Sequence, residues 1–190
     1  MVVDVNKFIS SMQLEKNHKQ YFNISENLAN VLANLVKLKK PMRVLEIGTS
    51  NGYSGLHILK ELPEGAVFKT IEVDSIRAEL ARENFKSCGF EFVEVINSNV
   101  FDFLSVYECE ERGFDFVFMD AAQKDYRKIV EILREKKMLN SGFMIVCDNV
   151  LSHFKYDYMR DFVDFMKEEE EFETQVLELD SGFLISCARF

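Results

Sequence analysis

The chain has 190 residues, of which 47% are hydrophobic, and a formal net charge of −9. This length suits a single domain, residues 1–190, that buries a core of its own, and the negative charge argues against broad nucleic-acid binding. The four cysteines lack C-x-x-C spacing, which disfavours a zinc site or a disulfide framework. No segment reaches the ~18 apolar residues of a membrane span or resembles a signal peptide, so we expect a cytoplasmic protein without a membrane partner.

Apolar spacing predicts helices and strands that alternate along most of the chain. Residues 24–39 fit an amphipathic helix, with Ser25 as its N-cap and Pro41 beyond its end. Short runs rich in β-branched and aromatic residues lie at 43–47, 67–73, 92–97, 114–119 and 143–147. Helical patterns at 76–87 and 126–133 separate some of these runs. The alternation predicts an α/β fold in which helices cover both faces of a mostly parallel sheet.

The pattern changes toward the C-terminus. A last long helix is predicted at 154–166, and two apolar runs at 174–179 and 183–188 flank the turn sequence Asp180-Ser181-Gly182. These two runs predict a terminal β-hairpin. The acidic run at 168–171 is typical of a solvated helix end.

The stretch from Glu46 to Ser54 joins a buried strand to a helix through a glycine turn. Gly48 and Gly52 lack Cβ atoms and so allow the backbone to approach a ligand, while free N–H groups at the start of the next helix point toward it. Their spacing differs from the G-x-G-x-x-G of dinucleotide-binding proteins. The turn therefore predicts a nucleotide-like cofactor, although an ordinary tight turn would use the same glycines.

Residues after the next two strands extend this prediction. Glu72 ends the second strand, where a carboxylate can accept both hydroxyls of a ribose. Enzymes that bind dinucleotides use an acidic residue in the same place, so Glu72 supports a nucleoside without identifying it. Ser98, Asn99 and Val100 follow the third strand at the same edge of the sheet and are weaker candidates for ligand contacts, since they would serve almost as well as loop residues.

Acidic residues also follow the fourth and fifth strands. Asp120 comes after residues 114–119, and Asp148 and Asn149 come after residues 143–147. Because the carboxyl ends of parallel strands share one edge of the sheet, we expect these side chains to meet there. Two carboxylates and an amide oxygen form the hard, all-oxygen set that Mg²⁺ prefers. A single Asp after a strand is usually a helix cap, but its pairing with a neighbouring Asp-Asn sequence is more specific.

Three motifs together carry a resemblance to a known family: Glu46 to Ser54, Asp120 to Tyr126, and Asp148 to Leu151. They resemble the divalent-metal-dependent O-methyltransferases related to catechol and caffeoyl-CoA O-methyltransferases, from about residue 24 to the end. The resemblance implies a Rossmann-like class I methyltransferase fold, with a mostly parallel seven-stranded sheet and an antiparallel strand from the C-terminal hairpin. It also implies S-adenosylmethionine (SAM) as the methyl donor, Mg²⁺ or another divalent cation, and a homodimer.

The implied reaction moves a methyl group from SAM to a hydroxyl oxygen of a metal-chelating acceptor. By resemblance, Asp120, Asp148 and Asn149 hold the metal, and the vicinal hydroxyls of the acceptor complete its coordination. Asp120 is on this basis also catalytic. The residues expected to bind the cofactor are Glu46, Gly48, Thr49, Ser50, Gly52, Tyr53, Ser54, Glu72, Ser98, Asn99, Val100 and Asp120.

Two departures of the chain from this family pattern bear on catalysis and on the acceptor. Relatives commonly carry a lysine three residues after the first metal-binding Asp, whereas this chain has Gln123 there and Lys124 next. Either Lys124 takes the catalytic role of that lysine or acidification by the metal suffices. The loop after Leu151 is also short, which predicts an open acceptor pocket or one completed by another subunit. The N-terminal extension, residues 1–23, could cover the acceptor, and His153 is expected to be a surface histidine rather than a base.

The acceptor stays open between two classes. A small catechol-like diol would need aromatic walls, for which the candidates are Phe22, Tyr53, Phe154 and Tyr156. A hydroxylated wobble uridine in tRNA would instead use the basic residues Lys124, Arg127 and Lys155. The net charge favours the small molecule. A nicotinamide oxidoreductase is disfavoured by the glycine spacing, and a non-catalytic SAM-binding protein stays open because of Gln123 and the short loop.

Overall fold

The computed structural model of the chain describes residues 3–14, 18–108 and 112–189. Its strands are β1 (Arg43–Ile47), β2 (Val67–Glu72), β3 (Glu94–Asn97), β4 (Phe114–Met119), β5 (Leu139–Cys147), β6 (Phe172–Leu177) and β7 (Phe183–Ala188). They form one seven-stranded sheet in the order β3-β2-β1-β4-β5-β7-β6. β7 runs antiparallel to β5 and β6, and the other neighbouring strands are parallel. The predicted mostly parallel sheet with a C-terminal antiparallel hairpin is confirmed.

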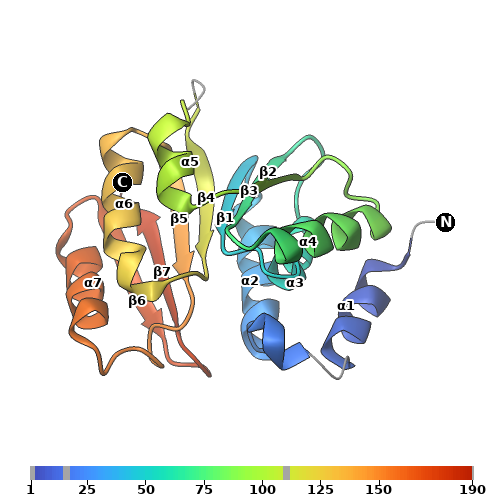
Figure 1. The fold of residues 1–190 in the computed structure, drawn as a ribbon. Coiled ribbons are helices and arrows are strands. Elements are labelled where there is room, and N and C mark those ends of the chain that lie inside the picture. Colours follow the sequence, from blue (N-terminus) through green and yellow to red (C-terminus); the bar gives the residue numbers. More distant parts are fainter. Residues whose placement is uncertain (1–2, 15–17, 109–111, 190) are drawn as a thin grey trace.

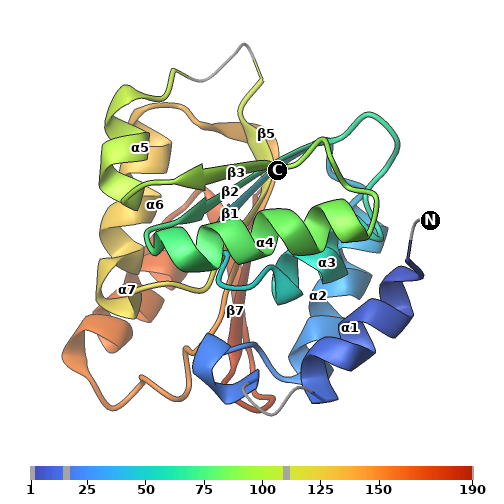
Figure 2. The ribbon, with the colours of Figure 1, turned by 45° about the vertical axis from the view of Figure 1, so that its right-hand side comes forward.

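Helices cover both faces of this sheet. They are α1 (Val5–Leu14), α2 (Glu26–Lys39), α3 (Tyr53–Leu59), α4 (Ser75–Ser87), α5 (Val100–Val106), α6 (Tyr126–Glu135) and α7 (Asp157–Glu168), with short 3₁₀ helices η1 (His18–Tyr21) and η2 (Gln123–Asp125). Figure 1 and Figure 2 show α1 to α4 on one side of the sheet and α5 to α7 on the other. Within the described ranges, no helix is long and apolar enough to cross a membrane.

Local sequence signals explain several helix ends. Ser25 caps α2, as predicted, because its Oγ accepts a hydrogen bond from the backbone N of Leu28 at 3.2 Å. Lys40 ends the same helix in the left-handed conformation. Asn99 caps α5, with its Oδ1 2.9 Å from the backbone N of Phe101. This cap fixes the loop between β3 and α5, where contacts with the cofactor are predicted.

The two faces of β1 belong to two separate hydrophobic clusters. Leu45 and Ile47 pack into the cluster under α5 to α7, whereas Val44 packs into the cluster under α1 to α4. Because side chains alternate along a strand, Glu46 lies on the face of Val44 and is directed toward α3. Cys88, Cys147 and Cys187 are free thiols, and Cys109 lies outside the described residues.

Several element boundaries differ from the prediction, and three of them have a clear structural cause. β5 begins at Leu139, because this residue pairs with Phe114 of β4. The register between the two strands then shifts, so that Phe116 pairs with Met144. α7 begins only at Asp157, since the preceding residues form turns, in which the backbone N of Tyr156 donates to the carbonyl of His153 at 2.9 Å. β6 begins at Phe172, which is fully buried and pairs with the end of β7. Strand pairing, which sequence spacing does not report, decides the starts of β5 and β6, and local turns decide the start of α7.

Candidate active site

A cavity of about 740 Å³ opens at the carboxyl ends of the parallel strands. Its wall combines turns that follow β1, β2, β3, β4 and β5 with two segments from elsewhere in the chain. Those two segments are residues 21–25, which precede α2, and residues 180–181 in the turn between β6 and β7. The cavity therefore lies where parallel α/β sheets bind their ligands, and the distant segments close its side.

The glycine turn brings the end of β4 against the end of β1. Gly48 has φ +99°, and a Cβ atom there would lie 2.0 Å from the carbonyl oxygen of Asp120. The backbone N atoms of Gly48 and Thr49 both donate to the carbonyl of Ile71, at 3.0 and 3.2 Å. Gly48 is thus required by an approach of protein backbone to protein backbone, and this approach places Asp120 beside the turn. The sequence predicted either a ligand contact or an ordinary tight turn at this glycine, and did not predict the contact with Asp120.

Glu72 lines the cavity with its carboxylate already oriented. Its Oε2 accepts from the backbone N of Ser50 at 2.8 Å, and its Oε1 accepts from the backbone N of Asp74 at 2.9 Å. The Oγ of Ser50 donates in turn to the carbonyl of Tyr21 at 2.6 Å. A carboxylate has about four acceptor positions, so two remain for hydroxyl groups of a ligand.

Glu46 lies beneath the turn and does not line the cavity. Its side chain is fully buried, and its two oxygens accept from the hydroxyls of Ser54 at 2.6 Å and Thr70 at 2.7 Å. Burial raises the pKa of Glu46 to about 7; the two hydroxyl donors oppose this rise, and the charge of Glu72 adds to it. Glu46 therefore supports the turn through Ser54, which does line the cavity.

Asp120, Asp148 and Asn149 meet at the cavity wall, as the sequence predicts. The Asn149 amide Nδ2 donates to Asp120 Oδ1 at 3.0 Å and to Asp148 Oδ2 at 3.2 Å. Asp148 Oδ1 also accepts from the backbone N of Asn149 and from Ser181 Oγ, both at 2.6 Å. One amide group therefore bridges two adjacent carboxylates, and we call these three residues the acidic trio.

The electrostatics of the acidic trio are those of a site that lacks positive charge. Burial raises the pKa of Asp120, and the charges of Asp148 and Glu46 raise it further. Burial also raises the pKa of Asp148, while the hydrogen bonds from Ser181 and Asn149 oppose the rise. A hard divalent cation fits this donor set, since two carboxylates and an amide oxygen are ligands it prefers. Among the described residues no group of three His, Cys, Asp or Glu side chains is placed to hold a metal ion, so Asn149 is needed as the third ligand.

The cavity gathers most of the residues predicted to bind a cofactor. Those at its wall are Gly48, Thr49, Ser50, Ser54, Glu72, Ser98, Asn99, Val100 and Asp120. Gly52, Tyr53 and Glu46 are not at the wall. Gly52 packs against the ring of Phe85, and the Tyr53 hydroxyl accepts from Gln13 Nε2 of α1 at 2.5 Å. The structure thus divides the predicted set into residues that face the cavity and residues that support the turn.

The residues predicted for catalysis and for the acceptor are divided in the same way. Lys124 is exposed in η2 and does not line the cavity, whereas Gln123 does. Of the aromatic candidates only Phe22 reaches the wall. His153, predicted to be a surface residue, is at the wall, with its Nδ1 2.7 Å from the hydroxyl of Tyr158.

Several residues at the wall had no part in the predicted site. Arg77 of α4 lies over the ring of Phe22, 5.4 Å from its centroid, and its Nη2 donates to the carbonyl of Gln20 at 3.2 Å. Its position in the first turn of the helix that follows Glu72 was a usable signal. Asp180 and Ser181 also line the cavity, but the sequence marks them only as a turn.

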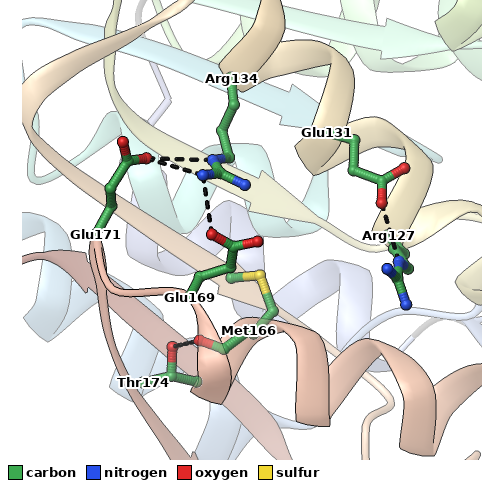
Figure 3. Close-up of polar contacts among 7 residues, drawn as sticks. All are labelled: Arg127, Glu131, Arg134, Met166, Glu169, Glu171 and Thr174. Atoms are coloured by element: carbon green, nitrogen blue, oxygen red, sulfur yellow. Dashed lines mark hydrogen bonds and ion pairs between the residues drawn. The ribbon is translucent and has the colours of Figure 1, made fainter.

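A second cavity of about 560 Å³ lies between α6 and α7. Its arginines are already engaged. Arg134 Nη2 contacts Glu169 at 2.9 Å and Glu171 at 3.1 Å, and Arg127 Nε contacts Glu131 at 2.9 Å (Figure 3). Both arginines of this cavity are therefore paired with carboxylates, and four of its six acidic residues belong to the run at 168–171 that was predicted to be a solvated helix end.

Comparison with known proteins defines the class to which this fold and site belong. The fold is that of the class I methyltransferases: the O-methyltransferase TomG from Streptomyces achromogenes, solved in complex with SAM, superposes with a TM-score of 0.84 at 21% identity, covering 100% of this chain and 92% of that one. The O-methyltransferase from Bacillus cereus, solved in complex with SAH, superposes with a TM-score of 0.80 at 23% identity, covering 97% and 89%.

Sequence comparison then gives the family. A family model described as O-methyltransferase matches residues 6–179, and the chain belongs to this family. Catechol O-methyltransferase B of Danio rerio is 28% identical over 161 residues, which cover 82% of this chain and 61% of that protein. Catechol O-methyltransferase of Niastella koreensis is 29% identical over 130 residues, covering 67% and 58%. The chain thus matches about three fifths of the length of these two curated relatives.

Proposed function

We propose that this protein transfers a methyl group from SAM to a hydroxyl oxygen of a metal-chelating acceptor, a small catechol-like diol. Membership of the O-methyltransferase family and relatives solved with SAM or SAH support the donor. The observation that carries the proposal is that the acidic trio and Glu72 line one cavity. A site for a nucleoside and a site for a hard cation therefore lie within reach of a single acceptor.

The cofactor would occupy the part of the cavity formed by the ends of β1, β2 and β3. Glu72 would accept the ribose hydroxyls, because two backbone N–H groups already hold its carboxylate in place. The loop at 98–100 would contact the base, and its conformation is fixed by the Asn99 cap. Gly48, Thr49, Ser50 and Ser54 line the remainder of this part and would face the methionine end. Preorganised polar groups of this kind bind without further loss of side-chain freedom.

The acceptor would bind next to the acidic trio. Asp120 and Asp148 would hold the cation together with Asn149, whose amide would turn to present its oxygen. The chemistry that such a cation supplies is Lewis acidity toward an acceptor hydroxyl, which lowers the pKa of that hydroxyl. Ser181 Oγ and the backbone N of Asn149 would keep Asp148 in position, since both already donate to its Oδ1. Asp120 would align the reacting oxygen with the cofactor, because Gly48 ties its backbone to the cofactor turn.

We infer that this reaction does not depend on a lysine base. Lys124 is exposed outside the cavity, and the position at the wall is taken by Gln123. Replacement of Lys124 by Ala is expected to leave kcat within about threefold of the wild-type value, since removal of a positioned acid or base costs about 10²-fold or more. A loss of that size in this variant would return the catalytic role to Lys124.

A tRNA acceptor is less consistent with the surroundings of the cavity. Arg127 is paired with Glu131 and lies over the ring of Phe165, and the Nζ of Lys155 lies over the ring of Tyr156. Neither residue lines the cavity, and Lys124 does not line it either. Phosphate groups therefore lack the convergent basic side chains that they require.

The decisive experiment replaces Asp148 by Ala and measures methyl transfer to a simple catechol as a function of Mg²⁺ concentration. Loss of one ligand from the acidic trio is expected to lower turnover by about 10³-fold. Calorimetric titration should give a SAM affinity within about threefold of the wild-type value, because Glu72 and the glycine turn are unchanged. Asp164, exposed on α7, provides a matched Asp-to-Ala control that should keep full activity. Unchanged turnover in Asp148→Ala would overturn the metal assignment.

A further inference from the structure

The wall of the large cavity is strongly biased toward negative charge. Its carboxylates are Glu72, Asp120, Asp125, Asp148 and Asp180, and they are accompanied by a single arginine, Arg77. Under the proposed function Glu72 binds the ribose, and the acidic trio is neutralised by a divalent cation. Arg77 lies at the cofactor end, against Phe22 and the carbonyl of Gln20. The two wall carboxylates that remain are Asp125 and Asp180.

Asp180 occupies the side of the acidic trio that is opposite to the cofactor. The start of β7 pairs with the end of β5, so the turn before β7 lies beside Asp148. Ser181, the next residue, donates to Asp148 Oδ1 at 2.6 Å. The strands that carry the cofactor turns, β1 to β3, lie on the other side of β4 and β5 in the sheet. An acceptor bound at the acidic trio would thus extend toward Asp180.

The carboxylate of Asp180 is held in place but is not neutralised. Its Oδ2 accepts from Ser25 Oγ at 2.5 Å and from Asn27 Nδ2 at 3.2 Å, and both donors are uncharged. No Lys, Arg or His side chain within the described ranges forms an ion pair with it. Ser25 is itself fixed as the cap of α2. Asp180 is therefore an oriented anion at the wall of a binding cavity.

We infer that Asp180 selects the acceptor by charge: it favours a diol that carries a cationic group, such as an ammonium, and disfavours diols that carry carboxylate or phosphate groups. The inference rests on the proposed function, because it takes the acidic trio as the place where the diol binds. An ammonium group near Asp180 gains a charge-assisted hydrogen bond at a carboxylate that needs no reorganisation. An anionic group there meets the negative charge of Asp180, which disfavours it by like-charge repulsion.

The test compares three catechols that differ only in one substituent: an aminoethyl group, a methyl group or a carboxymethyl group. For the wild-type protein, kcat/KM should be at least about tenfold higher for the aminoethyl than for the carboxymethyl compound, mainly through KM. Replacement of Asp180 by Asn keeps an oxygen acceptor for Ser25 and should reduce this ratio to within about threefold. Asp164→Asn removes the same charge from α7 and should keep the wild-type ratio. Added salt should also reduce the wild-type ratio, which provides a measurement that needs no variant.

The outcomes separate this inference from the function on which it rests. Turnover of all three catechols with equal kcat/KM would overturn the role of Asp180 and leave the methyl transfer intact. Absence of turnover with any of them would overturn the proposed function. In that case, titration of the same three compounds in the presence of S-adenosylhomocysteine and Mg²⁺ reads the charge preference in binding. Equal affinities there would overturn the inference as well, and an aminoethyl preference that Asp180→Asn abolishes would support it.

Discussion

The cavity at the strand ends and the cavity between α6 and α7 are both lined by carboxylates, but the partners of these carboxylates differ. Between the helices, Arg134 lies against Glu169 and Glu171, and the acidic residues face solvent. At the strand ends, Asp120 and Asp148 are adjacent, and the side chain that bridges them is the uncharged amide of Asn149. In the first arrangement the carboxylates pair with arginine or face water, whereas in the second two adjacent carboxylates have no cationic side chain among the described residues as a partner.

The number of acidic residues in a segment does not indicate a binding site, whereas the lack of a cationic partner does. The run at 168–171 is the densest acidic segment in the sequence, yet it forms ordinary ion pairs at a helix end. The acidic trio comes from two separate strand ends and involves only two charged side chains. Adjacent buried carboxylates are costly unless a cation accompanies them, so burial without a partner is the informative feature.

The largest expected effect comes from disturbing the contact that places Asp120 in its cavity. In Gly48→Ala, the new Cβ would lie 2.0 Å from the carbonyl oxygen of Asp120, at a φ of +99°. Strain and displacement together should lower the free energy of unfolding by at least ~3 kcal/mol. Urea unfolding measures this loss, and the remaining folded protein should bind SAM poorly.

Gly65 provides the matched control for this variant. It also has a positive φ, of +80°, but a Cβ atom there would meet nothing within 4 Å. Gly65→Ala should therefore lower the free energy of unfolding by about 1 kcal/mol, the cost of a positive φ at a residue with a Cβ atom. Equal losses of unfolding free energy in the two variants would mean that the close contact between Gly48 and Asp120 does not contribute to stability. The contact would then not be what holds the ends of β1 and β4 together.

The next largest effect is on the pH dependence of stability and concerns Glu46, which, like Asp120 and Asp148, has no cationic partner in the part of the chain that the structure describes. Burial raises its pKa from 4.5 to about 7, so the folded protein binds this proton more tightly than the unfolded chain does. The resulting stabilisation is complete below pH 4.5 and is lost as the pH rises through about 7. Over that range the shift corresponds to ~3 kcal/mol. Glu46→Gln should remove this part of the pH dependence.

The measurement is urea unfolding of the wild-type protein and Glu46→Gln at several values across that pH range. The difference in unfolding free energy between the two should change with pH in favour of the variant as the pH rises. Glu178, an exposed residue before the hairpin turn, supplies a matched control, and Glu178→Gln should follow the wild-type profile. A pH-independent difference for Glu46→Gln would show that Glu46 ionises normally in the folded protein.

The sequence predicts those parts of the site that depend on strand ends. Asp120, Asp148 and Asn149 converge because parallel strands end at one edge, and Glu72 faces the cavity for the same reason. These positions follow from where the predicted strands end in the sequence. The same logic predicted the sheet and its C-terminal hairpin, which the strand order confirms.

The other residues of the cavity wall could not be predicted from strand ends, because tertiary packing decides their positions. Asp180 reaches the cavity through the pairing of β7 with β5 and through hydrogen bonds to the start of α2. Tyr53 and Ser54 are neighbours in the chain, yet one is directed toward α1 and the other toward the cavity. A glycine turn predicts that a helix begins, but it does not predict how that helix is rotated.

The smallest expected effect tests the other side of the comparison, the cavity between α6 and α7. Arg134→Met keeps the apolar stem over Phe172 but removes the ion pairs with Glu169 and Glu171. Such partly exposed pairs contribute little, so the free energy of unfolding should fall by ~1 kcal/mol or less. Methyl transfer should be unchanged, since this cavity shares no residue with the cavity at the strand ends. A tenfold loss of activity in this variant would mean that both acidic cavities serve the reaction and that pairing with arginine does not distinguish a structural cavity from a functional one.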